Sequence, residues 1–212
     1  MWRKARQNNT IPDIIELERR KNLIDYRLID CHLKNQRIFL PHKNMKISLG
    51  GIGKGYAVDQ AFNYLRSNAL NNFYINGSGD IRVHSTKLAP RPWRIGIRNP
   101  FAEDEKKSMG VVHLRNQAIC SSGDYINVIK KGPKMFHHII DPKSGRSNNH
   151  LKAVTILSET TLDADVLATT FMTLNEKEAS TMAESLSLSA LWVNQQGKVS
   201  VSRALRMGLK QQ

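Results

Sequence analysis

Residues 48–61 read SLGGIGKGYAVDQA, and the first eight positions hold four glycines, Gly50, Gly51, Gly53 and Gly55. The apolar residues that follow recur at helical spacing: Ala57, Val58, Ala61, Phe62 and Leu65. The pattern therefore predicts a short strand around Ile47, a tight glycine loop and a helix of about fifteen residues. The free N–H groups at the start of such a helix, together with Lys54, can bind a phosphate. The loop matches neither of the common phosphate-binding glycine patterns, so a turn that serves only packing is the alternative.

Outward from this loop, most apolar stretches are short and bounded by Gly, Pro, Asn and Ser, which is typical of strands. Helical spacing appears in three further places, over about 12–21, from near Asp163, and over about 176–186. The stretches expected to form strands are FYING, DIRVHS, WRIGIR, GVVHL, FHHII, AVTILS, ALWV and KVSV, and YRLIDCHL with RIFL is expected to form a hairpin. We predict one α+β domain over residues 1–212, a largely antiparallel sheet flanked by helices, with a loose basic tail from about 203.

The charge of the chain is strongly positive, with 32 Lys and Arg against 18 Asp and Glu, or +14. Such a field favours anionic partners, but the basic groups are scattered and lack interleaved aromatic residues, so no nucleic-acid partner is expected. No apolar run reaches the length of a membrane span, and no signal peptide is recognised at the start. Cys31 and Cys120 lack metal-ligand spacing; buried free thiols are favoured over a disulfide between them.

Residues 160–170, TTLDADVLATT, place a carboxylate and a hydroxyl four residues apart. If a helix begins near Asp163, Asp165 and Thr169 share one face and could bind a hard cation such as Mg²⁺. The alternative is that one of the two aspartates only caps the helix and Thr169 only packs.

Residues 135–145, MFHHIIDPKSG, place two histidines next to each other in an expected strand. His137 and His138 should then point to opposite faces. The inward one could act as a general base, or it could be a structural residue with satisfied hydrogen bonds. NGSGD (76–80) and SSGD (121–124) are two more small-residue turns, each ending in an acid, that suit close approach to a ligand or simple chain reversal.

Five of these motifs, in this order and at these intervals, resemble the flavin transferases of the ApbE type: SLGGIGKGYAVDQA, NGSGDIRV, SSGDY, HIIDPKSG and DADVLATT. The resemblance extends from about Met1 to beyond Trp192. It implies an enzyme that uses Mg²⁺ to split FAD at its diphosphate and passes FMN to a threonine or serine hydroxyl of an acceptor protein, with AMP leaving. Acceptors in the family are flavin-bearing subunits of membrane redox complexes, modified at the periplasmic face of the inner membrane.

The resemblance also assigns roles to individual residues. Asp165 and Thr169 match the side-chain ligands of Mg²⁺, and Gly51 matches the position that offers its backbone carbonyl. Lys54 and Ile139 match positions that contact FAD, and His138 matches the histidine beside the reacting phosphate. Ser48 stands where the family commonly has an aspartate that contacts FAD, which is expected to weaken that contact.

Members of the family usually carry a leader peptide and an additional N-terminal portion, so we expect this chain to be a shortened transferase of reduced activity. Without a leader, a cytoplasmic location is expected if the chain is made alone. A silent flavin-nucleotide-binding fragment, or an enzyme that hydrolyses FAD to FMN and AMP, are the alternatives. The acceptor protein and the oligomeric state are not indicated by the sequence.

Overall fold

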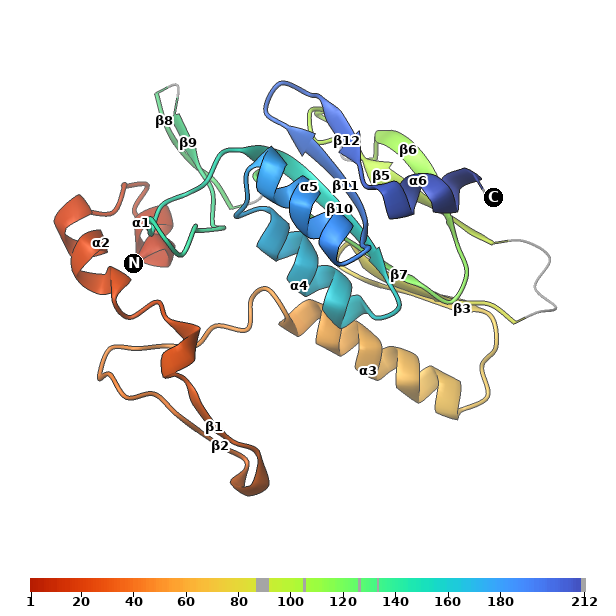
Figure 1. Ribbon diagram of the computed structural model, residues 1–212, viewed down its shortest axis with the longest axis horizontal. Coiled ribbons are helices and arrows are strands. Elements are labelled where there is room, and N and C mark those ends of the chain that lie inside the picture. Colours follow the sequence, from red (N-terminus) through yellow and green to blue (C-terminus); the bar gives the residue numbers. More distant parts are fainter. Residues whose placement is uncertain (87–91, 105, 126, 133, 211–212) are drawn as a thin grey trace.

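The structure is a computed structural model that describes residues 1–86, 92–104, 106–125, 127–132 and 134–210 (Figure 1). The helices are α1 (Trp2–Gln7), α2 (Ile14–Lys21), α3 (Gly53–Ser67), α4 (Thr161–Phe171), α5 (Glu176–Ser185) and α6 (Arg203–Lys210). The strands are β1 (Asp30–His32), β2 (Arg37–Phe39), β3 (Phe73–Gly77), β4 (Asp80–His84), β5 (Trp93–Arg98), β6 (Ser108–Leu114), β7 (Ala118–Gly123), β8 (Ile129–Lys131), β9 (Lys134–Phe136), β10 (Leu151–Ser158), β11 (Ser189–Asn194) and β12 (Val199–Val201).

A six-stranded sheet in the order β12-β11-β10-β7-β4-β3 forms the centre of the molecule, and every neighbouring pair is antiparallel. The helices α3, α4 and α5 lie together on one face of this sheet (Figure 1). The hairpins β1–β2, β5–β6 and β8–β9 form separate two-stranded sheets. The predicted α+β class with a largely antiparallel sheet and flanking helices is therefore confirmed.

The strands of the central sheet have two buried faces, because alternate residues point to opposite sides. On the helix side, Val154 and Ile156 of β10 pack with Ala164, Ala168 and Phe171 of α4. On the other side the core is formed by the β5–β6 hairpin and α6 against the sheet, and it contains Val83, Val112, Leu114, Leu157, Val193 and Leu205. Both faces of the central strands are thus covered, which holds α4 in a fixed position against β7 and β10.

Helices α3 and α4 cross very closely at Gly55. A Cβ atom on Gly55 would lie 2.5 Å from the carbonyl oxygen of Thr161 and 2.9 Å from Leu162 Cα. Asp59, one turn further along α3, accepts hydrogen bonds from the N–H groups of Thr161 and Leu162, each at 2.9 Å. The first N–H groups of α4 are thus satisfied by a side chain of α3, in addition to the N-cap Thr160.

The glycine loop and most helices lie where the sequence places them. Helix α3 has the expected length of 15 residues and buries Val58 and Phe62. Helix α5 begins with a capping box formed by Asn175 and Glu178. Within the described residues, no helix is both long and apolar enough to cross a bilayer.

Four expectations about local structure are wrong. Residues 46–49 form no strand before the loop, and FHHII forms one only up to Phe136. The pattern of SSGD predicts a turn, but its first three residues end β7, a central strand whose Ser121 and Ser122 pair with Thr155 and Val154 of β10. Backbone pairing with β10 holds these residues in the strand, despite their small side chains. The expected loose tail from 203 is helix α6, with Leu205 only 3% exposed, and residues 211–212 lie outside the described part.

The cysteines form no disulfide. Cys31 is exposed, which contradicts the expectation that it is buried, whereas Cys120 is buried as expected. Burial raises the pKa of the Cys120 thiol, as do the nearby carboxylates of Asp80 and Asp165. The thiol is therefore protonated and unreactive at neutral pH.

Replacement of Gly55 by alanine tests the helix crossing. Because the added methyl would meet backbone atoms of α4, the helices must separate, and we expect Gly55→Ala to lower the free energy of unfolding by about 1–3 kcal/mol. Gly53→Ala is the matched control, since its Cβ would meet nothing closer than Leu49 Cβ at 3.9 Å. We expect Gly53→Ala to be neutral or slightly stabilising. Urea denaturation of both variants is the measurement, and equal stabilities would contradict the importance of this crossing.

Candidate functional site

All seven residues singled out from the sequence line a single cavity of about 640 Å³: Ser48, Gly51, Lys54, His138, Ile139, Asp165 and Thr169. They come from the glycine loop, the start of α3, the segment after β9, and one face of α4. Ser121, Ser122 and Gly123 at the end of β7 complete this part of the wall. The structure therefore brings together residues that are up to about half the chain apart; their individual roles stay predictions.

The glycine loop lies against α4 without a side chain between them. A Cβ atom on Gly51 would lie 3.2 Å from Thr169 Cγ2 and 3.5 Å from its Oγ1. The loop is closed by hydrogen bonds from the N–H groups of Ile52 and Gly53 to the Leu49 carbonyl, at 3.1 and 2.7 Å. Ser48 Oγ accepts a weaker bond from Gly50 N at 3.4 Å. The Gly51 backbone and the Thr169 hydroxyl thus lie close together on the cavity wall.

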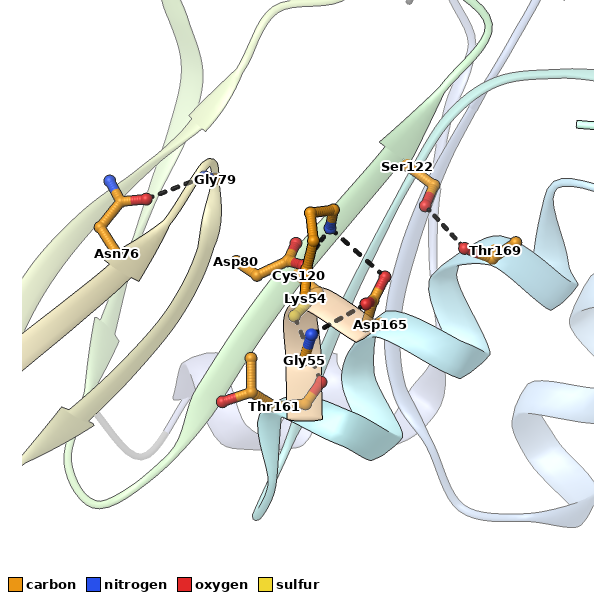
Figure 2. A network of polar contacts seen from close by, with 10 residues as sticks. All are labelled: Lys54, Gly55, Asn76, Gly79, Asp80, Cys120, Ser122, Thr161, Asp165 and Thr169. Atoms are coloured by element: carbon orange, nitrogen blue, oxygen red, sulfur yellow. Dashed lines mark hydrogen bonds and ion pairs between the residues drawn. The ribbon is translucent and has the colours of Figure 1, made fainter. Parts of the chain in front are cut away.

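Asp165 is the carboxylate of this cavity, and it is only 3% exposed. One oxygen accepts a hydrogen bond from Gly55 N at 3.0 Å, and the other lies 3.5 Å from Lys54 Nζ (Figure 2). As the four-residue spacing predicts, Thr169 is on the same face of α4, where its Oγ1 lies 3.4 Å from Ser122 Oγ. The alternative that an aspartate only caps the helix does not hold for Asp165, since the cap is Thr160.

Lys54 also forms an ion pair with Asp80, a residue that is 1% exposed and begins β4 (Figure 2). Asp80 is placed by the tight turn of NGSGD, in which Ser78 and Gly79 both have positive φ, at 57° and 99°. Such a two-residue turn matches the twist of the hairpin, and the amide oxygen of Asn76 accepts from Gly79 N at 2.8 Å. The sequence predicts this turn but indicates no role for Asp80.

The charges of this cluster are linked. Burial raises the pKa of Asp80, although the hydrogen bond from Lys54 opposes the shift. Burial acts to lower the pKa of Lys54, but the hydrogen bond to Asp80 and the charges of Asp80 and Asp165 outweigh it, so that this pKa is raised. The ammonium group therefore stays charged at neutral pH and is paired with both carboxylates.

The oxygen donors at this place suit a hard cation. Among the described residues, no three His, Cys, Asp or Glu side chains cluster in a way that could hold a metal ion. Mg²⁺, however, commonly uses only one or two protein carboxylates and completes its shell with water and substrate phosphates. The Asp165 carboxylate, the Thr169 hydroxyl and the Gly51 backbone fit this coordination preference. The Asp165 oxygen that faces only the Lys54 ammonium group keeps lone pairs for a further ligand.

The two histidines do point apart, but they follow β9 instead of lying in a strand, and the inward one is His137. It is 1% exposed, and both ring nitrogens are engaged: Nε2 with the Asn148 carbonyl at 2.5 Å and Nδ1 with Ile139 N at 3.2 Å. A buried ring with both nitrogens occupied cannot accept a proton from a substrate. Of the two alternatives for the inward histidine, the structural residue with satisfied hydrogen bonds therefore holds. The exposed His138 lines the cavity as His137 does.

These features define an α+β protein in which a glycine loop, the first turns of α3 and a polar face of α4 enclose a cavity with a basic group and oxygen donors. Comparison with known families identifies it further. The chain belongs to the ApbE family, whose model matches residues 1–192.

Its relatives include two proteins named FAD:protein FMN transferase. The one from Klebsiella pneumoniae (strain 342) is 28% identical over 209 residues, which are 98% of this chain and 64% of that protein. The one from Haemophilus influenzae is 31% identical over 167 residues, which are 78% of this chain and 48% of that protein. The chain thus spans between about half and two thirds of the length of these relatives.

Solved structures agree with this assignment. The ApbE protein of Thermotoga maritima superposes with a TM-score of 0.85 at 27% identity, over 93% of this chain and 64% of that one. The flavin transferase ApbE of Vibrio cholerae superposes with a TM-score of 0.79 at 28% identity, over 93% and 63%.

The buried histidine makes the stability of the protein depend on pH. Burial lowers the pKa of His137, so the folded chain holds the ring neutral at pH values where the unfolded chain, with a pKa of about 6.5, takes up a proton. Stability from this group is fully present above about pH 6.5 and is lost as the pH falls towards the folded pKa, by at most about 1.4 kcal/mol per pH unit.

We therefore expect His137→Gln, which cannot titrate, to reduce the loss of unfolding free energy between pH 7 and 5. His150→Gln, at an exposed histidine of the same segment, is the control. Urea denaturation across this pH range is the measurement; parallel curves for the wild type and His137→Gln would contradict the assignment.

Proposed function

We propose that the chain carries out the Mg²⁺-dependent transfer of FMN from FAD to a threonine or serine hydroxyl of an acceptor flavoprotein, with AMP as the leaving group. The observation that carries this proposal is that the residues matching the family motifs line one cavity, although they come from four separate segments. The names of the relatives support flavin transfer as the reaction class. Mg²⁺, the acceptor hydroxyl and the release of AMP rest on the resemblance and on the chemistry of the lining residues.

The chain's own groups suit a diphosphate. The N–H groups of Ile52, Gly53 and Gly55 at the start of α3 are bonded within the protein, so the positive end of the helix dipole and the charged Lys54 are what attract phosphate oxygens. Asp165, Thr169 and the Gly51 backbone are the groups that would hold Mg²⁺. Bound there, the ion would neutralise charge on a phosphoryl oxygen. Ser48 and Ile139 would contact the remainder of FAD from the loop and from the segment after β9.

His138 is the group that would accept the proton of the acceptor hydroxyl. It is exposed, lines the cavity and lies beside His137, whose two backbone hydrogen bonds fix the segment. The hydroxyl oxygen forms a bond to the phosphorus of the FMN half, the bond from that phosphorus to the bridging oxygen breaks, and AMP leaves with the bonding electrons. The proton passes to His138, so atoms and charges balance.

We further propose that the acceptor is a flavin-bearing subunit of a membrane redox complex, met on the periplasmic side of the inner membrane, as the family resemblance implies. Hydrolysis of FAD to FMN and AMP is a second candidate. The exposure of His138 favours it, because water reaches the same proton acceptor. The two reactions differ in whether FMN becomes attached to protein, and binding without AMP release would indicate the silent alternative.

Loss of the Asp165 charge tests the metal site. Asp165→Asn keeps an oxygen for the Gly55 N–H, so the helix crossing is preserved while the negative charge is removed. We expect FAD affinity in the presence of Mg²⁺ to fall by about tenfold or more, since a charged interaction of roughly 1.5–3 kcal/mol is lost. Titration calorimetry with and without Mg²⁺ is the measurement. Asp163→Asn, at an exposed position on the same helix, should behave as the wild type; equal Mg²⁺ dependence in both variants would argue against the site.

Replacement of His138 tests the proton acceptor. A general base contributes about 10²–10⁴-fold, so His138→Ala should lower the rate of AMP release by this factor while FAD affinity stays nearly unchanged. His150→Ala is the appropriate control, because it is exposed, whereas His137 is part of the core. AMP release from FAD, with and without a threonine-bearing acceptor, is measured by chromatography. A loss of affinity equal to the loss of rate would show that His138 only binds.

A further inference from the structure

Two further cations line the same cavity and belong to no motif of the sequence. Arg3 and Arg6 both come from α1, where a spacing of three places them on one face of the helix. They lie on a different wall from Lys54, which belongs to α3. Cationic side chains from two helices, α1 and α3, therefore line the cavity.

Helix α1 is anchored to the segment that carries the two histidines. Trp2 Nε1 donates a hydrogen bond to the Gly145 carbonyl at 3.0 Å, and its ring packs 6.2 Å from that of Phe136, the last residue of β9. Ala5 of the same helix is buried. These contacts fix the short helix, so that the positions of Arg3 and Arg6 relative to the His138 segment are set by the fold.

The charges of the cavity wall do not balance. The lining residues include three cationic side chains, Arg3, Arg6 and Lys54, against one carboxylate, Asp165, which leaves two positive charges in excess. Lys54 is already engaged with Asp80 and Asp165. In the part of the chain that the structure describes, neither Arg3 nor Arg6 makes an ion pair, and both are exposed. Two arginines held without an anionic partner on a cavity wall suit a ligand with two negative charges.

We propose that Arg3 and Arg6 bind the diphosphate of the dinucleotide, a role that rests on the proposed function. The guanidinium group presents paired N–H donors that match phosphate oxygens and stays charged at every physiological pH. When the bond to the FMN phosphorus breaks, the bridging oxygen stays with the AMP phosphate, which gains negative charge. The arginines stabilise that charge from α1, while Lys54 and the α3 N-terminus act from the other wall.

The test compares ligands with and without phosphate. We expect Arg3→Ala/Arg6→Ala to weaken the binding of both FAD and ADP by about tenfold or more, because charge-assisted hydrogen bonds of roughly 1.5–3 kcal/mol are lost. Binding of riboflavin, which has no phosphate, should be unchanged. Arg3→Lys/Arg6→Lys keeps the charge but loses the paired donors and should give an intermediate affinity.

Lys4→Ala/Lys46→Ala is the control for net charge. It also removes two positive charges, one of them from α1, but neither lysine lines this cavity; both line the neighbouring cavity around Ile11 and Ser48. At 0.15 M salt, screening over about 8 Å should leave FAD affinity within about twofold of the wild type.

Each outcome decides the proposal. Equal losses of FAD affinity in the arginine and lysine doubles, or an equal loss of riboflavin affinity, would overturn it, because the effect would then be general charge or altered structure. FAD affinity like that of the wild type in the arginine double would also overturn it while leaving the proposed function intact. If ADP binds in an arginine-dependent manner but FAD does not bind, the diphosphate site stands and the proposed function fails. If the wild type binds neither FAD nor ADP, both fail.

Discussion

The crossing of α3 and α4 at Gly55 is the contact on which the rest of the site depends. Because Gly55 has no side chain, the Asp165 carboxylate reaches its N–H group at 3.0 Å, and Asp59 reaches the first N–H groups of α4 from the same helix. Burial acts to raise the pKa of Asp59, but the hydrogen bonds from Leu162 and Thr161 hold it below the ordinary value. The result is that one helix presents the glycine loop and the other presents Asp165 and Thr169 to the same space.

The electrostatics of this space follow from the crossing. Two nearly buried carboxylates, Asp80 and Asp165, share the charge of Lys54, so the acids are compensated within the protein. Isolated charges at such depth would be costly, whereas a shared ammonium group lets both acids stay close to the cavity. The excess of positive charge is carried instead by exposed arginines on α1, where water solvates them cheaply until an anion binds.

The sequence predicts those parts of the fold that depend on local pattern. Periodicity identifies α3, α4 and α5, and the turn residues of NGSGD identify the β3–β4 hairpin. It fails for β7, because Ser121 and Ser122 look like turn residues, and their strand conformation comes from pairing with β10. It fails for α6 because Leu205 is buried in a cluster with residues of β5, β6 and the central sheet that are distant in the sequence. The conformations of β7 and α6 depend on tertiary contacts with residues distant in the sequence, which a short stretch of sequence does not reveal.

The same limit applies to the site. Family motifs select seven residues that do meet in one cavity, but the pattern of two adjacent histidines does not say which of them points inward, and only the structure shows that it is His137. The Lys54–Asp80 pair joins residues 26 positions apart, and the Asp59–Thr161 hydrogen bond joins residues 102 apart. Neither spacing has a sequence signature. Arg3 and Arg6 cannot be predicted as cavity residues from the sequence, because a chain with a net charge of +14 contains many basic residues and only the structure shows which of them line the cavity.

The charged and polar residues in and around the cavity fall into a buried group and an exposed group. Asp59, Asp80 and His137 are buried and form hydrogen bonds or ion pairs with other parts of the protein. They therefore hold neighbouring segments in position and do not take part in proton transfer to a ligand. His138, Arg3 and Arg6 are exposed, and their neighbours hold the segments that carry them. Phosphoryl transfer requires little covalent chemistry from a protein and much positioning of charge. A rigid buried frame with accessible cationic and basic groups at its edge meets that requirement. The buried residues Asp59, Asp80 and His137, whose pKa values are shifted from their ordinary values, hold the exposed groups in position.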